Sequence, residues 1–218
     1  MERKLGGQIQ GQAEMKSPDI LFGVLSTPER WYLGKCYRAA SPWLSHKNKP
    51  QNYSTGLSTV VARALVNIAA PRIAGKKVID PCCGMGNVVI EGLSMGMDIV
   101  GRDINPLAIR GARVNLNHFG YGDSLLVELG DLRDITMMYD AAIVDMPYNL
   151  CSVMSKEQCQ EMLQAVYKFS ERAVIVSSEQ LEDDIVQAGW CIKGQCTVAK
   201  GSFVRYVWLC CKSLDFDL

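Results

Sequence analysis

The feature that most constrains this chain is the stretch at 77–91, which reads KVIDPCCGMGNVVIE. Its opening residues predict a short strand, its glycines at Gly84 and Gly86 a tight loop, and its closing apolar residues the start of a helix. Glycine is needed in such a loop because the backbone turns sharply and lets a ligand lie against its N–H groups. Asp80 stands at the end of the strand, where α/β sheets present their ligand-binding groups.

The glycine loop fits two common nucleotide ligands poorly. A dinucleotide motif requires a third glycine three residues after the second, and this chain has Val89 there. A phosphate loop that ends in Gly-Lys-Ser/Thr is absent from the sequence. An acidic residue ahead of Gly-x-Gly instead suits a zwitterionic ligand that carries a sulfonium and no phosphate.

Composition indicates one α/β domain with a short appendage. The chain has 218 residues, of which 48% are hydrophobic, enough for a sizeable core. It contains no run of about 18 apolar residues, so we expect no membrane span. Residues 1–19 are polar, lack a signal-peptide core, and are expected to form a flexible N-terminus.

The cysteine content and the charge indicate which cellular compartment and which kinds of partner to expect. Nine cysteines form no Cys-x-x-Cys motif, and no histidine pair has zinc spacing, so we expect a reducing, cytoplasmic setting and no metal. The formal net charge of zero does not indicate a nucleic-acid binder. Residues 30–49, however, carry cations and no carboxylate, which indicates either a solvated face or a phosphate-contacting patch. These cations are Arg30, Lys35, Arg38, Lys47 and Lys49.

Strand and helix patterns alternate along the rest of the chain. Strands are predicted at 77–81, 98–103, 124–129, 141–145 and 173–177, with helices between them and another at 57–68. Residues 191–198 and 203–211 predict a closing hairpin. This order predicts a Rossmann-like α/β fold, with a doubly wound, mostly parallel seven-stranded sheet and an antiparallel C-terminal hairpin. We expect residues 54–218 to form the catalytic domain and 20–53 an N-terminal extension packed on it.

Acidic residues stand at four strand ends, which share one rim of a parallel sheet. They are Asp80, Asp103, Asp131 and Asp145. Asp103 follows the glycine loop by about 20 residues, where a carboxylate can accept hydrogen bonds from both ribose hydroxyls. Asp131 could accept from an adenine amino group. Any one of these carboxylates could instead be a helix cap, but four at consecutive strand ends favour a binding rim.

The Asp145-Met146-Pro147-Tyr148 motif indicates the acceptor chemistry. It resembles the Asp/Asn-Pro-Pro-Tyr motif of methyltransferases that act on a planar conjugated nitrogen, and the glycine stretch resembles motif I of S-adenosylmethionine-dependent methyltransferases. Such a nitrogen is a poor nucleophile, because its lone pair is delocalised. Asp145 and the carbonyl beside Pro147 could accept its N–H bonds and orient it, while Tyr148 stacks on the base. A packed proline-bearing turn is the alternative.

Two further patterns extend the resemblance. With Lys49-Pro50-x-x-Tyr53-Ser54 and Ala62-Arg63-Ala64-x-x-Asn67, the sequence from residue 49 to 211 resembles the tRNA guanosine-N2 methyltransferase family. The resemblance implies catalytic roles for Asp145, Pro147 and Tyr148. It also implies S-adenosyl-L-methionine contacts from Ser54, Asp80, Cys82, Gly84, Gly86, Asn87, Asp103, Ile104, Asp131, Leu132 and Asp145.

The same family resemblance raises the question of how RNA is held. Fuller members carry a THUMP RNA-binding domain ahead of the catalytic domain, and we expect no room for one here. RNA would then be held by the extension at 20–53, by a partner protein or by a second subunit in a homodimer.

Three functions remain open at this level. The leading hypothesis is methylation of an exocyclic base nitrogen, with guanine N2 of tRNA as the acceptor. Adenine N6 in DNA or RNA, or a glutamine amide in a protein, is the alternative acceptor, because all present a planar nitrogen. The third hypothesis is a non-catalytic subunit that keeps the fold and supports a partner enzyme.

Overall fold

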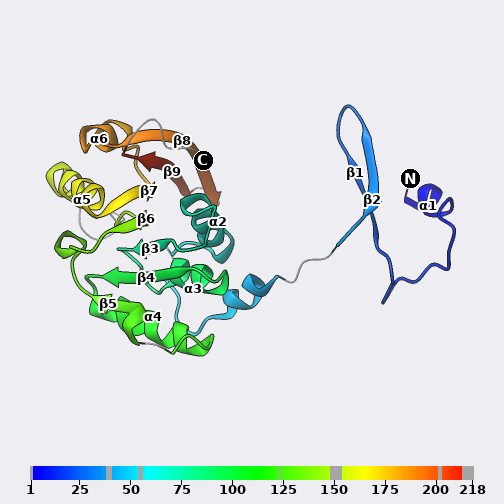
Figure 1. Ribbon diagram of the computed structural model, residues 1–218, viewed down its shortest axis with the longest axis horizontal. Helices are drawn as coiled ribbons and strands as arrows, with labels where there is room; N and C mark the ends of the chain where they lie inside the picture. The colour runs from blue at the N-terminus through cyan, green and yellow to red at the C-terminus, as the bar shows by residue number, and fades with distance from the viewer. Residues whose placement is uncertain are drawn as a thin grey trace. The chain divides into compact units, whose positions relative to one another are not determined.

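The computed structural model describes residues 2–37, 41–53, 56–122, 124–147, 154–200 and 203–212 (Figure 1). The chain divides into two compact units, Met1–Ser41 and Pro42–Leu218. The domain boundaries expected at 19/20 and 53/54 stay predictions.

The smaller unit contains a short helix and a hairpin. Its elements are α1 (Glu2–Gly6), β1 (Phe22–Ser26) and β2 (Trp31–Lys35). The two strands are antiparallel, with Ser26 opposite Trp31. The turn between them is closed by a 2.9 Å hydrogen bond from the Thr27 N–H to the Arg30 carbonyl. The sequence analysis had not predicted this hairpin.

The larger unit contains the alternating strands and helices. It begins with η1 (Pro42–Asn48), α2 (Thr59–Ala69), β3 (Lys77–Asp80), α3 (Asn87–Ser94), β4 (Asp98–Asp103) and α4 (Pro106–His118). It continues with η2 (Ser124–Leu126), β5 (Val127–Leu129), η3 (Leu132–Asp134), β6 (Tyr139–Asp145) and α5 (Lys156–Phe169). It ends with β7 (Ser170–Ser177), α6 (Glu182–Gln187), β8 (Cys191–Lys200) and β9 (Phe203–Cys211).

These strands form a seven-stranded sheet in the order β5-β4-β3-β6-β7-β9-β8. Strands β3 to β7 pair in parallel, while β9 pairs antiparallel with both β7 and β8. The predicted doubly wound sheet with an antiparallel C-terminal hairpin is therefore confirmed. The strand expected at 124–129 was wrong over its first three residues, which form the 3-10 turn η2 before β5 begins.

Alternate residues of the central strands feed two separate cores. In β6, Ala141 and Ile143 pack on one face of the sheet, in the cluster that includes residues of α2, α3 and α4. Ala142 and Val144 belong to the other cluster, with residues of α5 and α6. Successive side chains of a strand point to opposite faces, so a strand buried on both faces is apolar throughout. Helices cover both faces of this sheet (Figure 1).

A buried ion cluster fixes the segment that enters the larger unit. Glu91 of α3 is 1% exposed. Its Oε1 lies 2.6 Å from His46 Nδ1 of η1, and its Oε2 accepts a 2.9 Å hydrogen bond from Arg63 of α2. The Arg63 guanidinium also lies over the Trp43 ring, 4.7 Å from its centroid. These contacts hold η1, α2 and α3 together behind the glycine loop.

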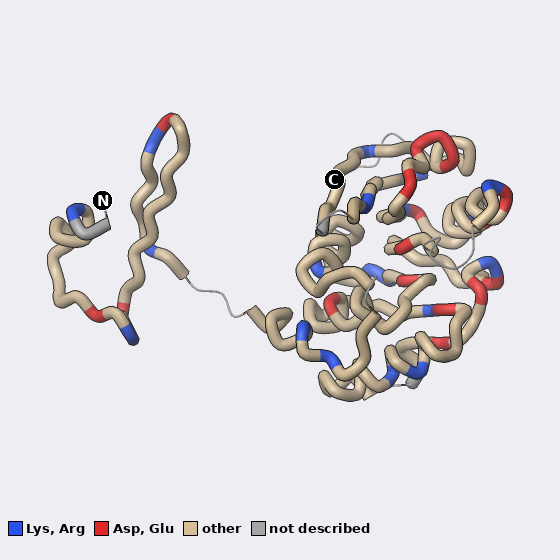
Figure 2. The backbone as a smooth tube through the Cα atoms, turned by 180° about the vertical axis from the view of Figure 1, so that it is seen from behind, with Lys and Arg blue, Asp and Glu red and all other residues tan. Residues whose placement is uncertain are grey.

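Acidic and basic residues are interspersed along the chain (Figure 2). The cation-rich run at 30–49 falls across the division between the units: Arg30 and Lys35 belong to the smaller, Lys47 and Lys49 to the larger. Arg38 lies outside the described residues. The run therefore cannot be treated as one surface.

Helix length and thiol state complete the description. Within the described ranges, every helix is too short or too polar to cross a membrane. The described cysteines are free thiols. Burial raises the pKa of Cys159 to about 11 and that of Cys210 to about 12, so both stay protonated at neutral pH.

Candidate active site

The glycine loop after β3 is a bend that only glycine adopts easily. Gly84 and Gly86 have φ angles of +52° and +80°, in the left-handed region. The Gly86 N–H donates a 2.8 Å hydrogen bond to the Cys83 carbonyl, which closes the bend, and Gly86 caps α3. A Cβ on Gly86 would lie 3.3 Å from the Ala112 Cβ, whereas one on Gly84 would meet no described atom within 4 Å. Within the described part of the chain, the space above Gly84 is therefore open to a ligand.

Asp103 at the end of β4 is bonded directly to this bend. Its Oδ2 accepts a 2.8 Å hydrogen bond from the Gly84 N–H, and its Oδ1 accepts one of 2.8 Å from the Asn105 N–H. Each carboxylate oxygen has two lone pairs. Both oxygens therefore keep acceptor capacity while the backbone holds the carboxylate in place.

Asp80 at the end of β3 is buried, with 3% of its surface exposed. Burial raises the pKa of this carboxyl well above its ordinary value, and the charges of Asp145 and Asp103 raise it further, against a lowering hydrogen bond from the Cys82 N–H. A cation placed beside Asp80 would favour its charged form.

All four rim carboxylates lie close enough to the half-buried Cys82 for their charges to act on its thiol. Loss of solvation raises the pKa of the Cys82 thiol, and four negative charges raise it further. These charges are those of Asp80, Asp103, Asp145 and Asp131. The strand-end acids and the glycine bend thus lie in one neighbourhood, as the parallel strand order requires.

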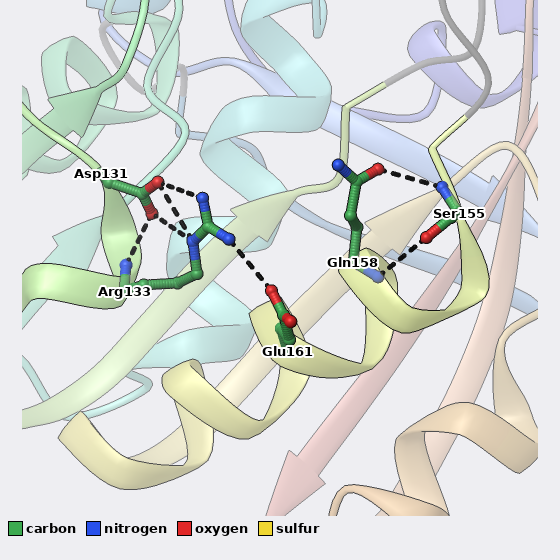
Figure 3. Close-up of polar contacts among 5 residues, drawn as sticks. All are labelled: Asp131, Arg133, Ser155, Gln158 and Glu161. Carbon is green, nitrogen blue, oxygen red and sulfur yellow. Dashed lines mark hydrogen bonds and ion pairs between the residues drawn. The ribbon is translucent and has the colours of Figure 1, made fainter.

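Asp131 has a strong partner of its own (Figure 3). It caps η3, and its carboxylate accepts hydrogen bonds from the Arg133 guanidinium, the shortest of them 2.6 Å. Arg133 also donates to Glu161 of α5 at 3.0 Å, so it points toward both acids. The Arg133 hydrogen bonds lower the pKa of Asp131, and partial burial opposes this effect. Asp131 is therefore ionised at neutral pH.

The Asp145-Met146-Pro147 turn, called here the acid-proline corner, begins at the last residue of β6. Asp145 is the last residue of the strand and is partly buried. Met146 is 1% exposed, and its N–H donates a 2.8 Å hydrogen bond to the Val176 carbonyl of β7. Proline, the commoner residue at this position of the motif, has no N–H and would lose that bond. Pro147 is exposed, and Tyr148 lies outside the described residues.

Four other predicted cofactor residues differ in their surroundings. Asn87 donates a 2.7 Å hydrogen bond from Nδ2 to the Leu57 carbonyl, while its buried Oδ1 has no hydrogen-bond partner among the described residues. Ile104 is 68% exposed, next to Asp103. The Leu132 side chain is buried in the same core cluster as Met146. Ser54 lies outside the described residues.

Asn115 of α4 is not among the residues predicted from the sequence to belong to the site. This side chain is 0% exposed and is bonded to the backbone of Met85, between the two loop glycines. The available signal was a polar residue on the apolar face of α4, next to Leu116 and one turn after Ala112.

Comparison with known proteins identifies the family. Residues 46–181 match the family model described as "RMKL-like, methyltransferase domain", which spans more than half of the chain. The chain belongs to this methyltransferase family. The match includes the glycine bend, the four rim acids and the acid-proline corner.

Curated relatives carry related names. The chain is 34% identical over 172 residues to a tRNA (guanine(10)-N2)-dimethyltransferase of Methanothermobacter thermautotrophicus, covering 74% of this chain and 51% of the relative. It is 27% identical over 170 residues to the tRNA (guanine(10)-N(2))-methyltransferase of Saccharomyces cerevisiae, covering 65% of this chain and 39% of the relative. The chain thus spans about half the length, or less, of these relatives.

Solved structures show that the fold is shared with other methyltransferases. TrmN from Thermus thermophilus superposes with a TM-score of 0.63 at 19% identity, covering 92% of this chain and 62% of that one. Magnesium protoporphyrin IX methyltransferase from Synechocystis, solved with bound SAM, gives 0.61 at 18% identity, covering 71% and 79%.

Proposed function

We propose that this chain is the catalytic part of an S-adenosylmethionine-dependent methyltransferase that modifies an exocyclic base nitrogen, with guanine N2 of tRNA as the acceptor. The observation that carries the proposal is the shared rim, where Asp103 is hydrogen-bonded to the glycine bend and the strand-end carboxylates act electrostatically on Cys82 of the same loop. The names of the curated relatives support the acceptor.

The residues of the bend fit the cofactor. The space above Gly84 is open, and the buried Oδ1 of Asn87 has no partner among the described residues. Asp103 keeps lone pairs for two ribose hydroxyls, and Asp131 is ionised and can accept from an adenine amino group. The α-ammonium group of the ligand would favour the ionised form of Asp80. When bound, S-adenosylmethionine supplies an electrophilic methyl group on its sulfonium.

The acid-proline corner would orient the acceptor. Asp145 Oδ and the backbone carbonyl beside Pro147 accept the N–H groups of the amine and direct its nitrogen toward the cofactor. Tyr148 would stack on the extruded base. Because the methylated nitrogen readily loses its proton, Asp145 acts mainly through orientation and needs no strongly basic carboxylate.

RNA binding requires more than this rim. The extension at 20–53 supplies cations, but the Trp43 ring already has the Arg63 guanidinium over one face. We propose that RNA is held by this extension, by a partner protein or by a second subunit in a homodimer. We also propose a reducing, cytoplasmic setting, in which the described cysteines would stay free thiols.

Methyl transfer to a panel of acceptors tests the proposal. The purified chain is incubated with tritiated S-adenosylmethionine and, separately, with total tRNA, rRNA, DNA and protein from cells lacking this gene. Label in tRNA that elutes as N2-methylguanosine supports the proposal. Label in N6-methyladenosine, in its DNA counterpart or in protein selects the alternative acceptor, and a chain that does not bind S-adenosylmethionine is a non-catalytic subunit.

A further inference from the structure

Asn115 in the middle of α4 makes three side-chain hydrogen bonds, all to the backbone of two other segments. Its Nδ2 donates to the carbonyls of Gln51 and Met85, at 2.9 Å in both cases. Its Oδ1 accepts a 2.8 Å hydrogen bond from the Gln51 N–H. Asparagine is a poor residue for a helix interior, so helix formation does not explain its presence.

The two segments that Asn115 joins both belong to the proposed cofactor site. Met85 is the residue between the two left-handed glycines of the bend. Gln51 lies three residues before Ser54, a predicted cofactor contact. One buried side chain therefore sets the spacing between the glycine bend and the chain that leads to Ser54.

Gly111, one helical turn before Asn115, lies on the same side of α4 and faces the same two residues, Met85 and Gln51. A Cβ built there would collide with the Met85 Sδ and would lie 3.6 Å from the Gln51 Cβ. The Met85 side chain thus fills the place of a missing side chain on α4. Gly111 leaves room for the Met85 side chain, and Asn115 donates a hydrogen bond to the Met85 carbonyl.

The Asn115 contact adds to the hydrogen bonds by which Cys83 and Asp103 already restrain the bend. Gly84 and Gly86 have positive φ angles, and glycine loses more conformational freedom on ordering than other residues. A loop already held in its bound conformation loses less entropy when a ligand binds, which strengthens binding.

Resting on the proposed function, we propose that Asn115 is a positioning residue for the cofactor: it holds the Met85 carbonyl and thereby the glycine bend in the conformation that binds S-adenosylmethionine. It does not contact the reacting atoms. Its loss should weaken cofactor affinity and leave turnover at saturating cofactor nearly unchanged.

The first test is Asn115→Asp, which keeps the size and the acceptor for the Gln51 N–H but removes both N–H donors, and with them the hydrogen bonds to the Gln51 and Met85 carbonyls. Cofactor affinity is measured by calorimetry below the melting temperature of the variant, and backbone hydrogen exchange of residues 83–88 is followed without ligand. We expect about tenfold weaker binding and faster exchange. Asn117→Asp, at an exposed position of the same helix, is the matched control and should change neither.

A second pair of variants covers the case in which Asn115→Asp does not fold. Gly111→Ala improves helix propensity but displaces Met85, so it should weaken cofactor binding without lowering the melting temperature. Met85→Ala in that background frees the space and should restore part of the affinity. If folded Asn115→Asp or Gly111→Ala binds the cofactor like the unaltered chain, the positioning role is wrong. If the unaltered chain does not bind it, the proposed function fails, and this inference fails with it.

Discussion

The Gly84 N–H donates a 2.8 Å hydrogen bond to Oδ2 of Asp103, which joins the bend after β3 to the end of β4. Asp103, which would bind the cofactor ribose, therefore also orders the glycine bend, against which the cofactor would lie. Loop and carboxylate are oriented before any ligand arrives, which lowers the entropic cost of binding.

Asp103→Asn should weaken S-adenosylmethionine binding by about tenfold or more, because an amide accepts at only one atom and brings an N–H toward the Gly84 N–H. Isothermal calorimetry measures the effect. Asp98→Asn, at the exposed first residue of the same strand, is the control. Equal affinity for the Asp103 variant and this control would contradict the role of Asp103.

Asp80→Asn should raise stability at neutral pH and weaken cofactor binding. Burial raises the pKa of Asp80 above its ordinary value of 3.8, so the folded chain binds this proton more tightly than the unfolded chain. The favourable contribution is complete below pH about 4 and is lost as pH rises through the folded pKa. Melting temperatures should therefore favour the variant by a few degrees at pH 7, with the difference closing near pH 4. A variant less stable at pH 7 would refute this assignment.

Glu91→Ala should destabilise the larger unit by about 3–5 kcal/mol, because it leaves the partly buried Arg63 and His46 without their carboxylate. Denaturant unfolding measures the loss. Glu128→Ala removes a carboxylate that is 61% exposed and pairs with Arg102, and it should cost less than about 1 kcal/mol. Similar losses in the two variants would show that the Glu91 cluster does not anchor η1.

The sheet and its rim could be predicted because both follow from local patterns. Apolar runs that end in an acid locate the parallel strands β3, β4 and β6, and Asn105-Pro106 begins α4 where the capping pattern predicts. The capping box of α5 is also confirmed, with Ser155 and Gln158 bonded to each other's backbone (Figure 3).

Long-range contacts could not be read from these patterns. His46 and Gln51 pack against Glu91 and Asn115, residues 45 and 64 positions further along the chain. No local periodicity predicts such pairs, so the role of the segment that contains His46 and Gln51 was missed. The hairpin β1–β2 was missed because its side chains are mostly exposed, which removes the alternation that marks a half-buried strand.

The most direct test of the shared rim is Asp145→Ala, which removes the acceptor oxygens, assayed for cofactor binding and methyl transfer in parallel. Asp140→Ala, near the other end of β6, is the matched control and should retain both properties. We predict that the Asp145 variant binds S-adenosylmethionine within about threefold of the unaltered chain and loses about a hundredfold or more of its turnover on tRNA. Unchanged turnover, or loss of binding together with turnover, would contradict the division of this rim into a cofactor half and an acceptor half.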